Sequence, residues 1–238
     1  MQLEAICKNY DEIKVLKNLN LTIKDKEIIC ILGPSGCGKS TLLNILAGTL
    51  KPDAGRIEGK KEKVGYVFQE DRLLPWKTVH ENIKLVNKKA SNVKIKELID
   101  RVGLKGFEDK YPSQLSGGMR QRCSIARAFN FQSEMLLMDE PFKSLDYDLR
   151  IKMVKSLIDI WQQWNNSIVF VTHEIDEALL LGNKIAVLSK NPCTVETILT
   201  INTSQNLRRL EDRELIDTRT KLIRMLSKEN DSRAYKSA

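Results

Sequence analysis

The sequence has no long hydrophobic run, and this absence limits the kinds of protein it can encode. No stretch of about 18 consecutive apolar residues occurs among the 238 residues, so we expect no segment that spans a membrane. The first residues have neither a basic start nor an apolar core, so we expect no secretory signal. Internal repeats and low-complexity tracts are also absent, which argues against a repeat protein.

Cysteine is scarce and irregularly spaced. The five cysteines, Cys7, Cys30, Cys37, Cys123 and Cys193, form no C-x-x-C pair. We therefore expect reduced thiols and no metal site. The hydrophobic fraction of 42% and the charged fraction of 29% are ordinary for a globular protein, and the length suits one large α/β domain or a domain with an insertion.

The chain carries an excess of positive charge, with a formal net charge of +8. Such a charge fits a nucleic acid or an anionic membrane surface as a partner. The basic residues are, however, spread along the chain and interleaved with acidic ones, which fits an ordinary solvated surface. The composition leaves both interpretations open.

The chain is organised around the glycine-rich segment GPSGCGKST at residues 33–41. It matches the phosphate-binding pattern G-x-x-x-x-G-K-[ST], and it lies between an expected buried strand at 28–32 and an expected helix at 41–47. This order places backbone N–H groups at a helix N-terminus, where anions bind. Lys39 is expected to reach the β- and γ-phosphates, and the Ser40 hydroxyl to bind Mg²⁺. The predicted nucleotide contacts here are Gly33, Pro34, Ser35, Gly36, Cys37, Gly38, Lys39, Ser40 and Thr41.

Two further predicted strands end in polar residues. Gln69 follows the strand expected at 64–68, and Asp139 and Glu140 follow the apolar strand expected at 135–138. Polar side chains at such strand ends face the ligand crevice of an α/β fold. Gln69 is therefore a candidate contact for Mg²⁺ or for an attacking water, although a capping role would also explain it. Asp139 is a candidate Mg²⁺ ligand, and Glu140 is a candidate base for a water.

Ser116 and the glycines after it predict a second anion site. A serine N-cap followed by Gly117 and Gly118 opens a predicted helix. A helix N-terminus of this kind binds anions, although an ordinary capped helix fits the same residues. His173 follows the strand expected at 167–172 and is a candidate for binding a phosphate oxygen.

The two ends of the chain predict different structures. Residues 3–30 predict two or three strands. Tyr10 lies in a polar stretch among them, either as an exposed side chain without a role or as a platform for an adenine ring. Residues 205–238 are charged and predict one helix at about 213–226.

In this order the segments resemble the ATP-binding subunits of ABC transporters over about residues 10–188. The discriminating stretch is LSGGMRQR at 115–122, which is similar to the family's signature motif. Residues 33–41 look like Walker A, 135–140 like Walker B with its catalytic glutamate, and 144–146 like the D-loop. The resemblance implies catalytic roles for Lys39, Gln69, Glu140 and His173. It implies nucleotide contacts, beyond those of Walker A, for Tyr10, Gln69, Ser116, Gly117, Gly118, Gln121 and Asp146, and metal contacts for Ser40, Gln69 and Asp139.

The resemblance also implies a fold class. We expect an α/β protein that has a P-loop NTPase core with a mostly parallel sheet, an N-terminal antiparallel β subdomain and an inserted α-helical subdomain. Residues 1–238 would form a single ABC ATPase domain, with the ATP-binding core at 1–78 and 131–204. The helical subdomain with the signature motif would occupy 79–130, and a polar helical tail 205–238.

The activity that the resemblance implies is hydrolysis of ATP to ADP and phosphate, coupled to transport, with ATP and Mg²⁺ as cofactors. Two chains, identical or paralogous, would pack head to tail with ATP between the Walker A of one and the signature of the other. The other partners would be integral-membrane permease subunits and, indirectly, a periplasmic or lipid-anchored solute-binding protein. The chain would then lie peripherally on the cytoplasmic face of the cell membrane and bind no nucleic acid.

The segment at 68–76 narrows the resemblance, because it looks like the Q-loop of importers for nitrate, sulfonates and taurine. This resemblance implies uptake of a small solute that is nitrate-, sulfonate- or taurine-like, or of a related small organic compound. Two residues depart from the family pattern: Lys26 before Glu27 and Lys143 after Phe142 each stand where glycine is usual. A soluble ABC-type ATPase that acts on nucleic acid is the alternative, mildly favoured by the charge. A P-loop kinase or a simple nucleotide-binding module fits the signature less well.

Overall fold

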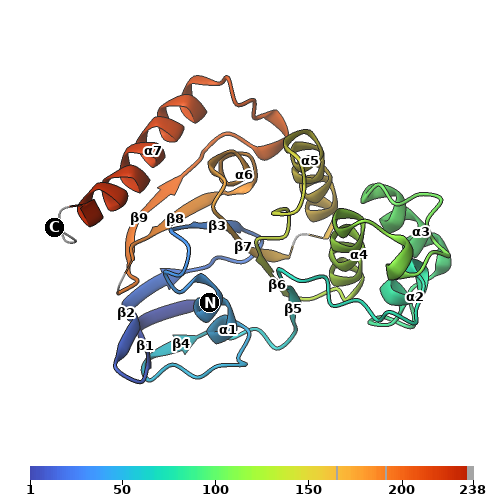
Figure 1. The fold of residues 1–238 in the computed structure, drawn as a ribbon, viewed down its shortest axis with the longest axis horizontal. Helices are drawn as coiled ribbons and strands as arrows, with labels where there is room; N and C mark the ends of the chain where they lie inside the picture. The colour runs from blue at the N-terminus through green and yellow to red at the C-terminus, as the bar shows by residue number, and fades with distance from the viewer. Residues whose placement is uncertain (165, 191, 235–238) are drawn as a thin grey trace. The chain divides into compact units, whose positions relative to one another are not determined.

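A computed structural model describes residues 1–164, 166–190 and 192–234. The chain divides into two compact units, whose elements Figure 1 shows as ribbons. The first unit consists of Met1–Lys61 and Ser167–Ala238, and the second of Glu62–Asn166. Among the described residues, no helix combines the length and the apolar character that crossing a membrane requires.

An antiparallel sheet in the first unit contains the two N-terminal strands. Its order is β2 (Ile13–Thr22), β1 (Gln2–Tyr10) and β4 (Ala54–Glu58). One face of β1 and β2 is apolar and buried, as at the paired residues Ile6 and Leu19, while many of their neighbours are exposed. This pattern is typical of antiparallel strands with one solvated face.

The parallel strands of the first unit are almost entirely buried. They lie, with one antiparallel strand, in the order β7 (Ser167–Thr172), β3 (Ile28–Leu32), β8 (Lys184–Leu188) and β9 (Val195–Thr200). β3 pairs in parallel with β7 and with β8, and β9 is antiparallel to β8. Because every residue of β3 and β7 is buried, both sequences are mostly apolar and do not alternate.

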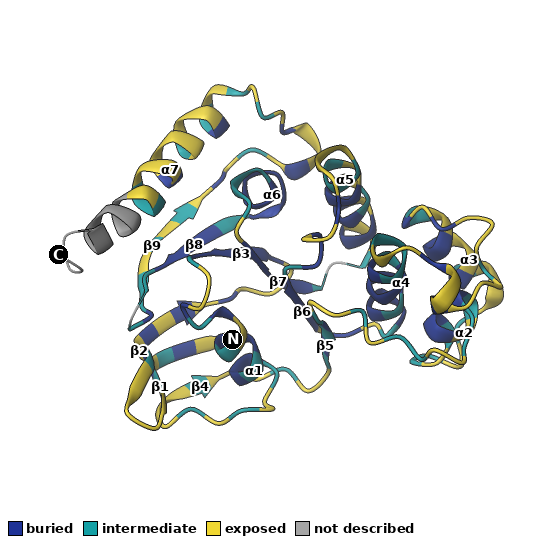
Figure 2. Cartoon of the chain, in the orientation of Figure 1, coloured by how far each residue is buried: buried dark blue, intermediate teal, exposed yellow. Residues whose placement is uncertain are grey.

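Helices complete the first unit. They are α1 (Lys39–Leu46), α6 (Ile175–Leu181), the 3₁₀ turn η2 (Gln205–Leu207) and α7 (Arg213–Ala234). α6 contacts β3 and β7 and is mostly buried, whereas α7 is exposed over most of its described length (Figure 2). The difference follows from composition, because α6 is rich in leucine and α7 is polar around most of its circumference.

The second unit combines a parallel strand pair with helices. The strands are β5 (Val64–Val67) and β6 (Met135–Asp139). The helices are α2 (Val79–Lys84), α3 (Asn92–Arg101), the 3₁₀ turn η1 (Pro112–Gln114), α4 (Gly117–Asn130) and α5 (Tyr147–Trp164). α2, α3 and α4 contact one another, and Phe129 of α4 meets Trp164 of α5 edge to face, with ring centroids 5.3 Å apart.

The predicted fold class is confirmed, because the chain is α/β with parallel strands, an antiparallel N-terminal sheet and helices between β5 and β6. Two predicted boundaries are wrong. α1 begins at Lys39 and not at Thr41, since Gly38 with a φ of 112° forms its N-cap, and the helix that begins at Arg213 continues to Ala234 and does not end near 226. Lys26 has a φ of 58°, in the left-handed region that favours glycine, which explains why glycine is usual at this position. The division into core, helical subdomain and tail stays a prediction.

Candidate functional site

The segment at 33–41 forms the loop that leads from β3 into α1. Gly36 and Gly38 have φ angles of 73° and 112°, which residues other than glycine rarely adopt. A Cβ atom at Gly38 would also lie 2.9 Å from Val15 Cγ1 of β2. The glycines of the motif are therefore required by the path of the backbone.

Lys39 is the first residue of α1, and it is only 6% exposed. Its Nζ atom donates hydrogen bonds to the carbonyl oxygens of Gly33, at 2.7 Å, and Pro34, at 2.9 Å. The ammonium group is thus held inside the loop, close to the start of the helix. A cation beside the N–H groups of a helix start makes a strong site for phosphate.

The register of the strands brings His173 to the same place. β3 and β7 pair in parallel with Leu32 opposite Thr172. Gly33 and His173 are the next residues along the two strands, so both leave the sheet at the same carboxyl edge. The His173 side chain is 44% exposed. The first unit therefore brings together the loop and the histidine that the sequence predicted as phosphate contacts.

Tyr10 is the last residue of β1, where a two-residue turn leads into β2. It pairs with Ile13, and Asp11 in the turn has a φ of 49°. The Tyr10 ring is half exposed, and Lys8 Nζ lies 5.9 Å from its centroid. An exposed ring at a hairpin end is accessible to a stacking base. Its contact with adenine stays a prediction.

The second unit repeats this arrangement of strand ends. β5 and β6 pair in parallel with Val67 opposite Met138. Gln69 lies two residues beyond Val67, while Asp139 and Glu140 lie one and two residues beyond Met138. The three candidate side chains therefore leave the strands at one edge, with Asp139 buried and Gln69 exposed.

Glu140 has an unusual backbone conformation. Its φ is 45°, in the left-handed region that residues other than glycine rarely adopt. Such outliers cluster at functional sites. The Glu140 side chain is 11% exposed, and Lys143 Nζ lies 3.1 Å from its Oε2 atom. Tyr66 of β5 is also affected by this region. Burial of its phenol is the main cause, and the charge of Asp139 the second, of a pKa far above the ordinary value.

The predicted N-cap of α4 is confirmed. Ser116 Oγ accepts a hydrogen bond from Met119 N at 3.3 Å. Ser116 and Gly117 are exposed, so the first N–H groups of the helix are accessible to a ligand. A Cβ atom at Gly118 would lie 2.6 Å from Leu145 Cδ2, so a larger residue there would require the Leu145 side chain to move.

Gln121 and Asp146 have local structural partners. The Gln121 side chain is buried, and its amide donates to the carbonyl oxygen of Phe68 at 3.0 Å, just before Gln69. Asp146 Oδ1 accepts a hydrogen bond from Leu149 N at 3.0 Å, at the start of α5. The contacts of both side chains with nucleotide stay predictions.

The sequence analysis missed two arginines that connect α4 to the loop after Gln69. Arg120 Nε donates to Asp71 Oδ2 at 2.9 Å. Arg127 donates to the carbonyl oxygens of Asp71 and Arg72 at 3.0 and 2.9 Å. Their seven-residue spacing places both on one face of a helix, but it does not indicate their partners. The loop and the signature helix are therefore mechanically linked within the second unit.

The three predicted metal contacts, Ser40 in α1 of the first unit and Gln69 and Asp139 in the second unit, all carry oxygen donors. Ser40 offers a hydroxyl oxygen, Gln69 an amide oxygen and Asp139 a carboxylate. Mg²⁺ prefers hard oxygen ligands and is commonly held by one or two carboxylates together with substrate phosphates. The residue types therefore fit this ion.

The family model described as "ABC transporter" matches residues 16–143, more than half of the chain. The chain belongs to the ABC transporter family. An uncharacterized ABC transporter ATP-binding protein of Methanocaldococcus jannaschii is 40% identical over 237 residues, which cover 93% of this chain and 87% of that protein. An aliphatic sulfonates import ATP-binding protein of Bacillus thuringiensis subsp. konkukian is 42% identical over 202 residues, which cover 81% of this chain and 80% of that protein.

Solved structures of ABC proteins show the same fold. A bacterial ABC transporter cassette, solved as a dimer, gives a TM-score of 0.75 at 32% identity, over 85% of this chain and 99% of that one. The same values hold for that cassette in a post-hydrolysis state bound to ADP and Pi. This ABC protein is therefore an ATP-binding ATPase, and the predicted family and activity are confirmed. The roles of the individual site residues stay predictions.

Proposed function

We propose that this ABC ATPase energises the uptake of a small solute, nitrate-, sulfonate- or taurine-like or a related organic compound, through separate membrane permease subunits. A relative at 42% identity is named for the import of aliphatic sulfonates, and residues 68–76 resemble the Q-loop of such importers. The chain would work peripherally on the cytoplasmic face of the membrane, and a solute-binding protein would act through the permease. Neither the family match nor these relatives favour the nucleic-acid alternative.

The proposed reaction is phosphoryl transfer from ATP to water. The water oxygen bonds to the γ-phosphorus, the bond from that phosphorus to the bridging oxygen of ADP breaks, and Glu140 accepts the proton of the water. Lys39, the N–H groups of residues 33–41 and His173 stabilise charge on the transferred group. Mg²⁺, when bound, neutralises charge on the β- and γ-phosphates. The residues that would hold it are Ser40, Gln69 and Asp139.

The observation that carries the proposal is the exposed, serine-capped start of α4. The chain has two helix starts suited to phosphate, α1 and α4, but one P-loop sequence. A second anion site is explained if it completes the nucleotide site of another chain. We therefore propose a head-to-tail dimer, of identical or paralogous chains, in which Ser116, Gly117 and Gly118 contact the γ-phosphate held by the partner's loop. A cassette of similar fold was solved as a dimer, which supports association of two chains.

The test uses the Glu140→Gln variant, which keeps the shape of the side chain but removes the base. Its mass is measured by light scattering with and without Mg-ATP. The same background then carries Ser116→Arg, which places a long cationic side chain at the exposed helix start. Ser113→Arg is the matched control, because Ser113 is also exposed but does not cap α4.

We expect Mg-ATP to convert the Glu140→Gln monomer into a dimer, Ser116→Arg to abolish the dimer, and Ser113→Arg to preserve it. A dimer that survives Ser116→Arg would contradict the head-to-tail arrangement. Fast ATP hydrolysis by a wild-type monomer would contradict the mechanism. The solute class is tested separately, by uptake of a labelled alkanesulfonate into cells whose only copy of this chain is the Glu140→Gln variant. Uptake of the alkanesulfonate at the wild-type rate would contradict the proposed solute class.

A further inference from the structure

α6 begins two residues after His173 and is coupled to the turn that carries this histidine. Thr172, directly before His173, donates a hydrogen bond to the buried carboxylate of Glu177 in α6. The Thr172 hydroxyl also accepts a hydrogen bond from Glu174 N at 3.0 Å. The turn and the first part of α6 are therefore joined from both sides of His173, and a displacement of α6 would displace His173 with it.

The other end of α6 is held by Arg208, from the segment that follows η2. Arg208 is 7% exposed, and its Nη1 atom donates to the carbonyl oxygens of Leu179, Leu180 and Gly182 at 2.8, 3.1 and 2.9 Å. Its Nε atom donates to Thr203 O at 2.8 Å. The last carbonyls of a helix lack partners within the helix, and a cation there is favoured by the helix dipole. Burial lowers the pKa of Arg208 to about 10, so the side chain remains a cation at neutral pH.

α7 holds the first turn of α6 through an ion pair. Arg219 Nη2 lies 3.1 Å from Asp176 Oδ1 and 3.2 Å from Asp176 Oδ2. The Asp176 side chain is 14% exposed and the Arg219 side chain 46%, so the carboxylate is shielded from water while the guanidinium is half exposed. The start of α7 is itself fixed by Glu214, whose carboxylate accepts hydrogen bonds from Asn202 N and from the Thr203 hydroxyl. These bonds lower the pKa of Glu214, with the Thr203 hydroxyl as the main cause.

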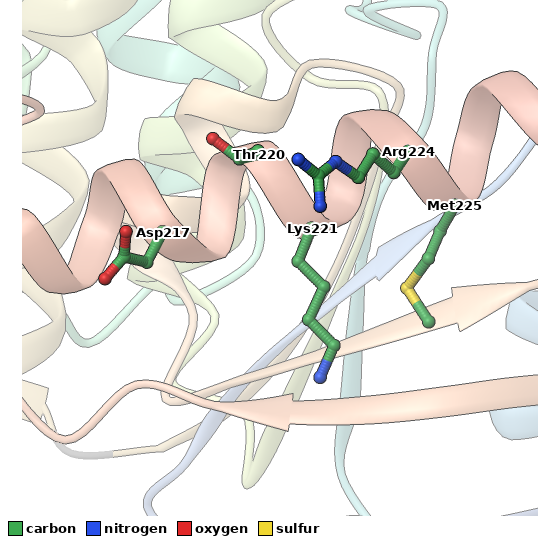
Figure 3. A pocket seen from close by; sticks show the side chains of 5 residues that line it. All are labelled: Asp217, Thr220, Lys221, Arg224 and Met225. Carbon is green, nitrogen blue, oxygen red and sulfur yellow. The ribbon is translucent and has the colours of Figure 1, made fainter.

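α7 buries few apolar side chains along its described length. Among its described side chains, the buried apolar ones are Leu215 and Leu222. Five side chains of its middle section line an open cavity of about 480 Å³, and Figure 3 shows Lys221 and Met225 pointing away from the helix on the same side. The residues that line it are Asp217, Thr220, Lys221, Arg224 and Met225. The bond from Arg219 to Asp176 therefore joins α7 to α6 in addition to the burial of Leu215 and Leu222.

We infer that Arg219 is a positioning residue for ATP hydrolysis, which acts through Asp176 and α6 to hold the His173 turn in place. The C-terminal segment is then part of the machinery that aligns the histidine with the γ-phosphate. This inference rests on the proposed role of His173 at the γ-phosphate. The P-loop, which binds most of the nucleotide, is not part of this connection.

The expected effect is on turnover and not on nucleotide affinity. Loss of the ion pair leaves α6 anchored at its C-terminal end by Arg208, so its first turn gains freedom without unfolding. Small misplacements of a catalytic group lower the rate strongly, by up to about 100-fold per ångström, so we expect Arg219→Ala to lower kcat about tenfold. The KM for ATP should stay within about twofold of wild type, because loss of an interaction made only in the transition state lowers kcat alone.

The experiment measures kcat, KM for ATP and Tm of the full chain for Arg219→Ala, Arg219→Lys, Asp176→Asn and the double variant Arg219→Ala/Asp176→Asn. Arg213→Ala is the matched control, because Arg213 is on the same helix, is 97% exposed and lies 4.0 Å from its acidic neighbour. Arg219→Lys keeps the charge and should recover most of kcat. The double variant should be no slower than Arg219→Ala, because residues that act through one contact are not additive.

Two sets of outcomes separate the inference from the function on which it rests. A kcat for Arg219→Ala equal to that of Arg213→Ala would overturn the inference, as would a raised KM at unchanged kcat or fully additive effects of Arg219→Ala and Asp176→Asn. A loss of kcat that only follows a loss of Tm, and that Arg219→Lys does not recover, would show a merely structural role and would overturn it too. His173→Ala is measured alongside. Wild-type activity of that variant would instead contradict the proposed role of His173.

Discussion

The two units hold their reactive groups in different ways, although each presents them at the ends of a parallel strand pair. In the first unit, β3 is followed by backbone N–H groups that glycine angles and the bonds of Lys39 keep in a loop. In the second unit, β5 and β6 are followed by side-chain oxygens of Gln69, Asp139 and Glu140. The comparison suggests that the first unit mainly binds the nucleotide and the second mainly supplies the water chemistry and the contact to a partner chain.

The largest effect is expected from Lys39→Ala in the first unit. The variant removes the cation inside the loop, so we expect both nucleotide affinity and hydrolysis to fall, the latter by about 1000-fold or more. Calorimetric titration with ATP and a phosphate-release assay measure the two quantities. Lys51→Ala, at an exposed lysine, is the control. Normal ATP affinity of the Lys39→Ala variant would contradict the assignment of nucleotide binding mainly to the first unit.

Glu140→Gln in the second unit should affect only hydrolysis. Loss of a general base lowers the rate by about 100- to 10,000-fold, while the loop that binds ATP is unchanged. ATP affinity, measured by the same titration, should stay within about twofold of wild type. Hydrolysis at more than a tenth of the wild-type rate would mean that another group takes the proton.

Gly118→Ala should weaken the second unit's contact with a partner chain. The new Cβ would lie 2.6 Å from Leu145 Cδ2, so the Leu145 side chain must move away from the start of α4. Overpacking of this kind costs about 1–3 kcal/mol, and we expect dimerisation in the Glu140→Gln background to weaken about tenfold. Leu145→Ala added to Gly118→Ala makes room and should recover dimerisation, measured by light scattering at several concentrations. Failure to recover would show that the clash is not the cause.

The smallest effect is expected from Lys143→Gly, which restores the residue usual in the family. Its Nζ atom lies 3.1 Å from Glu140 Oε2, but its side chain is half exposed, and ion pairs of exposed side chains are worth about 0–1 kcal/mol. Freed from this cation, Glu140 should interact more readily with water, so we expect kcat to rise about twofold. Lys152→Ala, at an exposed residue of α5, is the control. A fall in kcat would mean that Lys143 helps to place Glu140.

Much of the site could be predicted because its residues stand at strand ends and helix starts, positions that leave local signals. Apolar runs indicated β3, β6 and β7, and the candidates were the glycine-rich motif after β3 and the polar residues Asp139 and His173 at the ends of β6 and β7. Ser116 was predictable as an N-cap for the same reason. The left-handed φ of Glu140 left no such signal, because glutamate is not a residue that indicates it.

The connections between segments could not be predicted. Arg120 reaches Asp71 across 49 positions of sequence, and Arg219 reaches Asp176 across 43. A charged residue on an exposed helix usually faces water, and periodicity does not identify which one has a distant partner. Arg208 was equally hidden, since its partners are backbone carbonyls that every sequence contains.

The pairing of Leu32 with Thr172 also constrains how homologous genes can change in length. One residue inserted into or deleted from β3 or β7 would move the residue after that strand by about 3.3 Å relative to its neighbour and would turn alternate side chains to the opposite face. The register of β3 and β7 therefore fixes the position of Gly33 relative to His173. Insertions and deletions across the family should accumulate in exposed loops such as 59–60 and should be absent from both strands.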